Sequence, residues 1–395
     1  MPVPTPFHPR TAALCESLRW KDWAGHFAVC SYGVLHDAEY FAIRHAAGLL
    51  DVTPLFKYEV TGPGAASFLA RVMVRDIRSL GVGRVAYCPW TDEEGKTLDD
   101  GTVTRLEEER FRVTSAEPAF QWLAAHTRDF RAEVRDVTEE VGALAIQGPR
   151  SRAILMETCD GDVGSLRFFR ATAGSINGQG VEITRTGYTG DLGYEVWVPR
   201  EGALAVWDAL MEAGRPHGLL PAGLDALDVT RIEAGFILQG VDYFSARDCL
   251  IEPQKSSPFE IGLGWAVGLE REPFLGQAAL REEKHKGSSR ALVGLEIDWD
   301  ELERLYEHAG LPPALPCGAW RSAVPVYHGS RQVGRATSGA WSPTLKKNLA
   351  LASVEARFAS PGSVLRIEAT VEFERRTVLA RVVERPFFDP QRKRA

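Results

Sequence analysis

The chain has 395 residues, of which 45% are hydrophobic and 25% charged, the profile of a globular protein with two or three domains and a large core. Its formal net charge of −7 is spread along the chain, which argues against nucleic acid as the main partner because phosphate binding needs a basic surface. No apolar run approaches the roughly 20 residues that span a bilayer, and the first residues lack the pattern of a signal peptide.

The first half of the chain alternates predicted helices with predicted strands after a proline-punctuated arm over residues 1–20. Apolar residues at helical spacing predict a helix over 36–49, which Gly48 ends. Further helices are predicted after Gly62, over 119–130 and after Gly148. The strands predicted in this half are 56–60, 84–90, 96–106, 111–115 and 140–147.

Two adjacent acids, Asp99 and Asp100, lie inside the long strand predicted over 96–106. Side chains alternate between the two faces of a strand, so one of these carboxylates faces inward and needs a hydrogen-bond partner or a ligand. The alternative is that both acids lie at the edge of a sheet, and this segment alone favours neither arrangement.

A glycine-rich turn separates the predicted strands 181–184 and 194–198. In the second of these strands, alternation places Glu195 and Trp197 on one face. A carboxylate beside aromatic rings on such a strand can bind a flat, polar heterocycle. The alternative is an ordinary hairpin with a glutamate on the surface.

Helices are predicted over 199–214 and 222–235. On the second helix, Asp228 and Arg231 share an apolar face because they are three residues apart. An arginine held by an aspartate on such a face suits a ligand carboxylate or carbonyl. The alternative is an exposed ion pair of the helix, which contributes only about 0.3–0.5 kcal/mol.

The charged stretch 281–289, which ends in Gly-Ser-Ser, is the best domain boundary in the chain. Before it, an irregular loop over 240–257 leads to a turn and a buried strand predicted over 257–267. Beyond it, short strands typical of a small barrel or sandwich are interrupted by a helical piece and a proline-rich loop over 298–321. These strands are 291–297, 324–327, 332–337, 349–354, 363–367 and 377–383.

The six cysteines are scattered and include no C-x-x-C pair, so we interpret them as reduced thiols of a cytosolic protein. The nine histidines form no H-x-x-x-H pattern. The sequence therefore predicts a cytoplasmic location and no metal site.

Six segments, in one order along nearly the whole chain, resemble the glycine-cleavage T-protein (aminomethyltransferase) family, including its tetrahydrofolate-dependent demethylase relatives. Each match alone is weak, but six matches in register are strong evidence for the family and its fold. The segment Gly187–Glu195 resembles the family's G-Y-T-G-E-x-G-Y-E. The other segments are Gly48–Val52, Leu98–Asp100, Leu224–Gly235, Pro258–Trp265 and Gly334–Leu345.

The resemblance implies an α+β, three-domain T-protein-like fold around a central folate cavity, with a C-terminal small β-barrel. The implied folate-binding domain is discontinuous and takes residues 1–50 and 140–285. Residues 51–139 would form an α+β domain with a strand meander, and residues 286–395 the C-terminal β-barrel domain.

The family binds tetrahydrofolate, so the resemblance implies this co-substrate and a site for it. Asp99 would be the acid near the reactive N5, and Arg231 would lie near the pterin and the reaction centre. Glu195 would hold the pterin ring, whose N–H donors suit a carboxylate. The remaining implied folate contacts are Tyr87, Tyr188 and Trp265.

The implied activity is transfer of a one-carbon group to N5 of tetrahydrofolate, helped by proximity and by a carboxylate where positive charge develops. In the T-protein reaction, an aminomethyl group on a lipoylated carrier protein is the donor, and ammonia and 5,10-methylene-tetrahydrofolate are the products. Relatives of the same fold take methyl groups from small aryl ethers, sulfonium compounds or methylamines.

Three departures from the family pattern concern the donor. Thr53-Pro54 stands where the family has Ser-His, the loop 240–258 is long, and the segment 298–327 resembles the demethylase relatives. A demethylase of a small methylated substrate is therefore the alternative function, and a non-catalytic folate-binding module is a second alternative. A small-molecule donor or a lipoylated carrier protein is the expected partner, and neither nucleic acid nor a membrane is.

Overall fold

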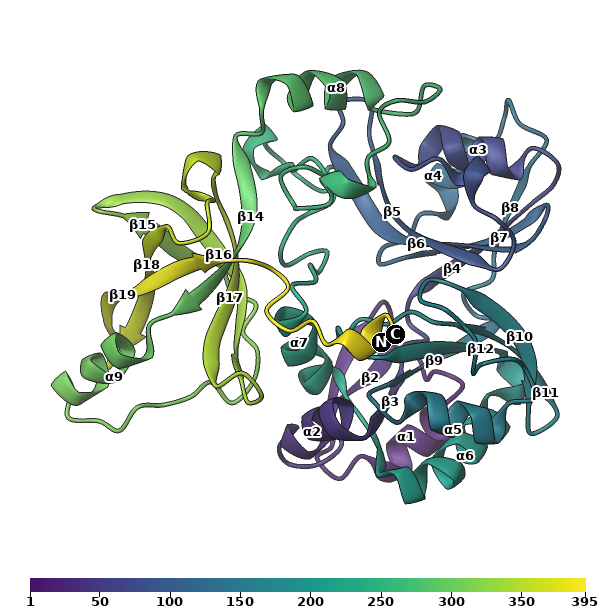
Figure 1. Ribbon diagram of the computed structural model, residues 1–395, viewed down its shortest axis with the longest axis horizontal. Helices are drawn as coiled ribbons and strands as arrows, with labels where there is room; N and C mark the ends of the chain where they lie inside the picture. The colour runs from purple at the N-terminus through teal and green to yellow at the C-terminus, as the bar shows by residue number, and fades with distance from the viewer.

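The computed structural model describes residues 1–395 and contains three larger β structures (Figure 1). They are a six-stranded mixed sheet, a five-stranded antiparallel sheet and a closed six-stranded barrel. A separate hairpin is formed by β1 (Arg19–Trp23) and β2 (His26–Ser31). No helix is both long enough and apolar enough to cross a membrane.

The six-stranded sheet has the order β10-β11-β12-β9-β3-β13, in which only β3 and β13 are parallel neighbours. In the sequence, β3 precedes the strands of the five-stranded sheet, and the other strands of the six-stranded sheet follow them. The strands are β3 (Ala47–Asp51), β9 (Val141–Gln147), β10 (Ala171–Ile176), β11 (Gln179–Thr184), β12 (Gly193–Pro199) and β13 (Leu219–Pro221). The helices of this unit are α1 (His8–Leu14), α2 (Asp37–His45), α5 (Ser151–Thr158), α6 (Ala203–Gly214) and α7 (Leu224–Glu233).

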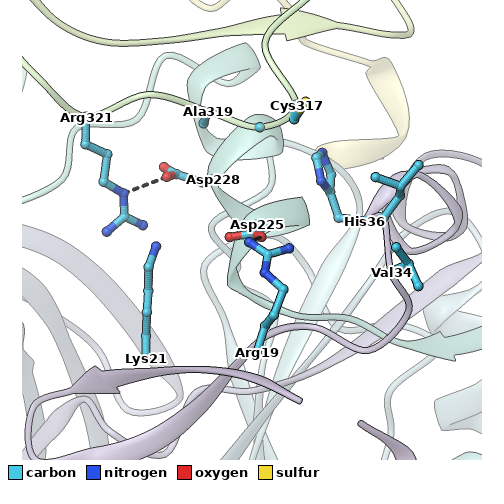
Figure 2. A pocket seen from close by; sticks show the side chains of 11 residues that line it. Arg19, Lys21, Val34, His36, Asp225, Asp228, Cys317, Ala319 and Arg321 are labelled. Atoms are coloured by element: carbon cyan, nitrogen blue, oxygen red, sulfur yellow. Dashed lines mark hydrogen bonds and ion pairs between the residues drawn. The ribbon is translucent and has the colours of Figure 1, made fainter. Parts of the chain in front are cut away.

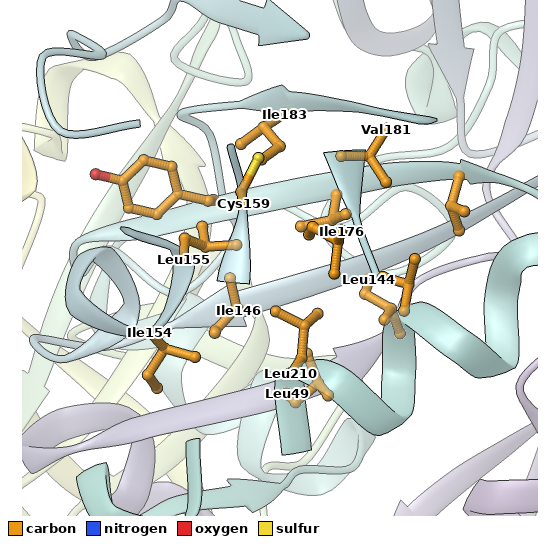
Figure 3. Close-up of a cluster of buried hydrophobic side chains, with 14 of the residues drawn as sticks. Leu49, Leu144, Ile146, Ile154, Leu155, Cys159, Ile176, Val181, Ile183 and Leu210 are labelled. Carbon is orange, nitrogen blue, oxygen red and sulfur yellow. The ribbon is translucent and has the colours of Figure 1, made fainter. Parts of the chain in front are cut away.

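Alternation along β12 gives this sheet two different faces. Tyr194 points into a core with α5 and α6, where Leu155 and Leu210 meet the strands (Figure 3). Trp197 points to the opposite face, into a second core that includes α7 and side chains of the barrel. Glu195 pairs with residues of that second face, so the predicted separation of Glu195 and Trp197 from Tyr194 is confirmed.

The five-stranded sheet has the order β5-β6-β7-β4-β8 and packs on α3 (Ala65–Val72) and α4 (Phe120–Ala125). Its strands are β4 (Phe56–Thr61), β5 (Arg84–Thr91), β6 (Thr97–Glu107), β7 (Arg110–Ser115) and β8 (Glu133–Asp136). Asp99 and Asp100 pair with Trp90 and Pro89 of β5, but β6 pairs with β7 only from Val103 onward, so at the two acids β6 has a strand on one side only. Asp99 is nevertheless buried and accepts backbone hydrogen bonds, as predicted for an inward-facing acid, so the structure combines features of both alternatives.

The C-terminal strands close into a barrel, so the barrel alternative is confirmed over the sandwich. The strands are β14 (Arg290–Ile297), β15 (Val324–His328), β16 (Arg331–Ser342), β17 (Lys347–Glu355), β18 (Val364–Val371) and β19 (Glu374–Val383). Helix α8 (Gln277–Lys286) precedes the barrel, and α9 (Trp299–His308) lies in the segment between β14 and β15.

Two predictions of local structure are wrong. The helix predicted over 36–49 ends at His45, and the strand β3 follows at once, because Leu49 and Leu50 are buried on opposite faces of the sheet. The strand predicted over 257–267 is a series of turns with a 3₁₀-helix at its end.

The last residues, 384–395, leave the barrel and return to the six-stranded unit (Figure 1). Arg392 forms an ion pair with Asp191 of the glycine-rich turn, with 2.7 Å between Nε and Oδ1. The guanidinium of buried Arg44 lies 4.2 Å from the ring centroid of Phe388. Asp191 of the glycine-rich turn therefore binds the C-terminal segment.

Candidate functional site

Asp99, the acid predicted to lie near N5, is a buried carboxylate held by the backbone. One oxygen accepts hydrogen bonds from the N–H groups of Ala116 at 3.1 Å and Glu117 at 2.9 Å. The other oxygen accepts one from the N–H of Asp100 at 2.8 Å. Burial, and next the charge of Asp100, raises the pKa of Asp99 well above its usual range. These partners indicate that Asp99 fixes the chain that follows β7.

Asp100 is the acid of the pair that meets aromatic side chains. It accepts hydrogen bonds from the hydroxyls of Tyr87 on β5 and Tyr243 in the loop after α7. Burial raises the pKa of Asp100, and the two tyrosine hydroxyls oppose that rise. A half-buried carboxylate with no cation beside it is suited to take a proton or to stabilise a developing positive charge.

Tyr243 is a site residue that the sequence did not predict. It is buried and lies in the long loop that the sequence predicted only as irregular. Its hydroxyl also lies 3.5 Å from Asp99, so it contacts both acids. No periodic pattern in the loop could have indicated this position.

Trp265 borders the site from outside. Its ring stacks on that of Tyr87, with 6.1 Å between the centroids and 18° between the planes. The guanidinium of Arg75 lies 5.9 Å from the Trp265 ring. Because Trp265 is 65% exposed, it does not line a closed interior, but its free face can stack on a flat ligand.

Arg231 is almost completely buried, so the alternative of an exposed helix ion pair is wrong. Its Nε donates to Asp228 at 2.7 Å, and its Nη1 donates to Asp242 at 2.6 Å and to Ser338 at 3.0 Å. Its Nη2 is buried without a hydrogen-bond partner. An unpaired buried donor costs about 1–3 kcal/mol, so Nη2 is the part of Arg231 that a ligand acceptor would satisfy.

Tyr188 of the glycine-rich turn lies between these groups. Its ring stacks on Phe236, with 5.7 Å between the centroids, and its hydroxyl donates to the carbonyl of Ile237. Burial raises the pKa of Tyr188, while the nearby charge of Arg231 lowers it and that of Asp100 raises it further. We call the following set the tyrosine–acid centre: Tyr87, Asp100, Tyr188, Arg231 and Tyr243.

Glu195 is a second carboxylate without a cation. Its Oε2 accepts hydrogen bonds from the hydroxyls of Thr184 at 3.4 Å and Thr186 at 2.5 Å, and its Oε1 has no partner. Burial raises the pKa of Glu195, and the threonine hydroxyls oppose that rise. No hydrogen bond joins Glu195 to the tyrosine–acid centre, so a ligand that contacts both must extend between them.

Thr53, at the position where the family has a serine, is buried and makes structural contacts. Its hydroxyl hydrogen-bonds with the backbone of Ala143 of β9, and its carbonyl accepts from Nζ of Lys57 at 2.7 Å. Thr53 therefore joins β9 to the start of the five-stranded unit.

A cavity of about 470 Å³ lies beside the tyrosine–acid centre and is not lined by its tyrosines (Figure 2). It is bordered by β1, residues 34–36, the start of α7 and residues 317–321 of the segment between β14 and β15. Asp228 lines this cavity and accepts from Nε of Arg321 at 2.6 Å while it holds Arg231. Asp228 thus connects the cavity, which it lines, with Arg231 of the tyrosine–acid centre.

Comparisons with known proteins agree on one family. Residues 13–271 match the GCVT N-terminal domain, and residues 290–389 match the glycine cleavage T-protein C-terminal barrel domain. The aminomethyltransferase of Halothermothrix orenii is 34% identical over 353 residues, which are 88% of this chain and 90% of that protein. The aminomethyltransferase of Bacillus cytotoxicus is 35% identical over 356 residues, 89% of each chain.

A solved structure has the same fold over nearly the whole chain. The crystal structure of the glycine cleavage system aminomethyltransferase T from Bartonella henselae matches with a TM-score of 0.82 and 25% sequence identity. The match covers 98% of this chain and 99% of that one, so the likeness includes the barrel as well as both sheets.

Proposed function

Because the chain belongs to the glycine-cleavage T-protein family, we propose that it transfers a one-carbon group from a donor to N5 of tetrahydrofolate. The family, its α+β fold with the C-terminal barrel and the class of enzyme, a transferase of one-carbon groups, are confirmed predictions. The observation that best supports the proposed site is that Asp100 meets two tyrosine hydroxyls and no cation.

We propose Asp100, in place of Asp99, as the carboxylate beside the reacting nitrogen. Asp99 is occupied by three backbone N–H groups, whereas Asp100 is bound only by side-chain hydroxyls. At this position a carboxylate stabilises the positive charge that develops on an attacking amine and can accept its proton. Its raised pKa makes it a stronger base than an exposed aspartate.

Glu195 and Arg231 are the proposed contacts of the heterocycle. The free Oε1 of Glu195 can accept from N–H groups of a pterin, and the unpaired Nη2 of Arg231 can donate to its carbonyl. Tyr87 and Tyr188 present aromatic rings to a flat ligand. Bound tetrahydrofolate would supply the nucleophilic amine, and the chain would orient it and stabilise charge.

The donor we propose first is an aminomethyl group on a lipoylated carrier protein, because relatives that align with 88–89% of the chain at 34–35% identity are aminomethyltransferases. The second candidate is demethylation of a small methylated substrate. It is favoured by the segment 298–327, which brings Arg321 to the wall of the cavity at Asp228.

A panel of donors tests this proposal. The protein is incubated with tetrahydrofolate and, in turn, a lipoylated carrier protein loaded with an aminomethyl group, methoxyaromatics, methylated amines and sulfonium compounds, and the products are identified by mass. Ammonia with methylene-folate supports the first donor, and methyl-folate with a free phenol, amine or thioether supports the second. Product from none of these donors contradicts the proposed transfer.

A further inference from the structure

The cavity at Asp228 has a cationic end and an apolar end. Lys21 of β1 and the guanidinium of Arg321 point toward one another across one end (Figure 2). At the other end lie Val34 and Leu35, which are 81% and 62% exposed. Exposed apolar side chains beside converging cations fit a small molecule that is itself amphipathic.

The side chains at the cationic end of the cavity have nitrogens that no protein group binds. Asp225 pairs with Arg19 at 2.8 Å, and Asp228 pairs with Arg321 at 2.6 Å. Lys21 forms no ion pair and no side-chain hydrogen bond, and Arg321 uses only its Nε. The ammonium of Lys21 and the two terminal nitrogens of Arg321 therefore remain free on the same side of the cavity.

Two like charges that converge repel one another unless an anion lies between them. A carboxylate is the anion that matches the planar fork of a guanidinium with a lysine beside it. We propose that this cavity binds a small carboxylic acid, with its carboxylate between Lys21 and Arg321 and its apolar part against Val34. The volume of about 470 Å³ is sufficient for such a ligand.

Two reactants of the proposed reaction can carry that carboxylate: the one-carbon donor and the glutamyl end of tetrahydrofolate. Asp228 holds both Arg321 at the cavity and Arg231 in the tyrosine–acid centre, so the proposed carboxylate site adjoins that centre. The carboxylate site itself does not rest on the proposed function, because it is measured without turnover.

Calorimetry on the full-length protein with benzoate as the probe tests the site. We expect benzoate to bind, its neutral analogue benzamide not to bind, and Lys21→Met to weaken benzoate binding about tenfold or more, as for a lost charge-assisted hydrogen bond. Lys21 is exposed, so this variant is expected to fold, and circular dichroism checks that it does. The matched control is Lys284→Met, at an exposed lysine of α8 that forms no ion pair.

A second titration identifies the source of the carboxylate. If the glutamyl end is the ligand, tetrahydrofolate binds more tightly than tetrahydropteroate, which lacks glutamate, and Lys21→Met abolishes the difference. If the donor is the ligand, Lys21→Met leaves tetrahydrofolate affinity unchanged and raises the KM for carboxylate-bearing donors. Benzoate that fails to bind, or that binds Lys21→Met as tightly as the wild type, overturns the proposed site whatever the enzyme's reaction.

Discussion

Asp99 accepts hydrogen bonds from the N–H groups of Asp100, Ala116 and Glu117, and it is 3% exposed. In Asp99→Asn an NH₂ group replaces an oxygen that accepted from these donors, so at least one buried N–H loses its partner. We expect the free energy of unfolding to fall by about 1–3 kcal/mol. Urea denaturation measures it, and an unchanged midpoint would contradict the structural role of Asp99.

Glu195 gives a prediction about pH. Burial raises its pKa, so Glu195 takes up a proton at a pH where an ordinary glutamate is still charged, and it then no longer accepts hydrogen bonds as a carboxylate. Tetrahydrofolate affinity is expected to fall as the pH drops through that raised pKa. Glu195→Gln should bind about tenfold more weakly, a loss of about 1.4 kcal/mol, at neutral pH.

The check is calorimetry of tetrahydrofolate over a series of pH values below neutrality, with wild type and Glu195→Gln side by side. The wild type is expected to lose affinity more steeply than the variant as the pH falls, because the variant has no carboxylate to protonate. Parallel pH profiles would assign the titration to another group.

At the residue scale, the sequence predicted that one acid of the 99–100 pair needs a partner, and the family resemblance implied Asp99 as the acid near N5, whereas we propose Asp100. The choice between the two acids depends on Tyr243 and on the backbone after β7, neither of which alternation along β6 can indicate. The elements that carry Glu195 and Arg231 were easier to predict, because each residue lies on a regular strand or helix whose faces the sequence pattern defines; their roles toward tetrahydrofolate stay predictions.

At the scale of single elements, Gly101 decides how closely β6 and β7 can pair. A Cβ at this position would lie 1.9 Å from the carbonyl oxygen of Thr114. We expect Gly101→Ala to separate the strands locally and to lower the free energy of unfolding by about 1–3 kcal/mol. Because Asp100 is its neighbour, turnover should fall as well.

The matched control is Gly180→Ala in β11, where a Cβ would meet nothing within 4 Å. Thermal unfolding of the two variants is compared with that of the wild type. Equal transition temperatures for both variants would show that β7 can move away from Gly101 without cost.

The errors in predicting single elements have a common cause. The strand β3 follows α2 directly, and Leu49-Leu50 is an apolar pair that fits a helix as well as a strand buried on both faces. The prediction of a strand over 257–267 is wrong because Gly262, with a φ of 76°, turns the chain where an extended backbone was expected. Periodicity alone could not decide either case.

At the scale of the whole molecule, Glu233 of α7 joins the six-stranded unit to the barrel. It is fully buried and accepts from Nε of Arg44 at 2.9 Å and from the hydroxyls of Tyr40 and Ser342 at 2.5 Å. Glu233→Gln removes the closer of the two carboxylates beside the buried guanidinium and leaves only Asp191, 3.6 Å from Nη1, so we expect a loss of about 3–5 kcal/mol.

Denaturation followed by both fluorescence and circular dichroism measures this loss, with Glu212→Gln as the control. Glu212 is exposed on α6 and forms no ion pair. If Glu233→Gln is no less stable than the control, Glu233 does not hold the units together.

The family and the barrel could be predicted because their signals are local: six short segments and a series of short strands. The contacts between units could not, because they join residues far apart in the chain. Glu233 and Ser342 are 109 positions apart, and Arg392 and Asp191 are 201 positions apart. The return of residues 384–395 to the first unit likewise has no sequence pattern of its own.

If Asp100 acts on the reacting nitrogen of bound tetrahydrofolate, as we propose, the Asp100→Asn variant loses turnover. The variant keeps the size of the side chain and one acceptor oxygen, so one tyrosine hydroxyl must turn to accept from the new NH₂ group, and it cannot take up a proton or carry a negative charge. With whichever donor the wild type uses, kcat is predicted to fall by about 10²–10⁴-fold, while tetrahydrofolate affinity changes little. An Asp100→Asn variant with wild-type kcat would contradict the account.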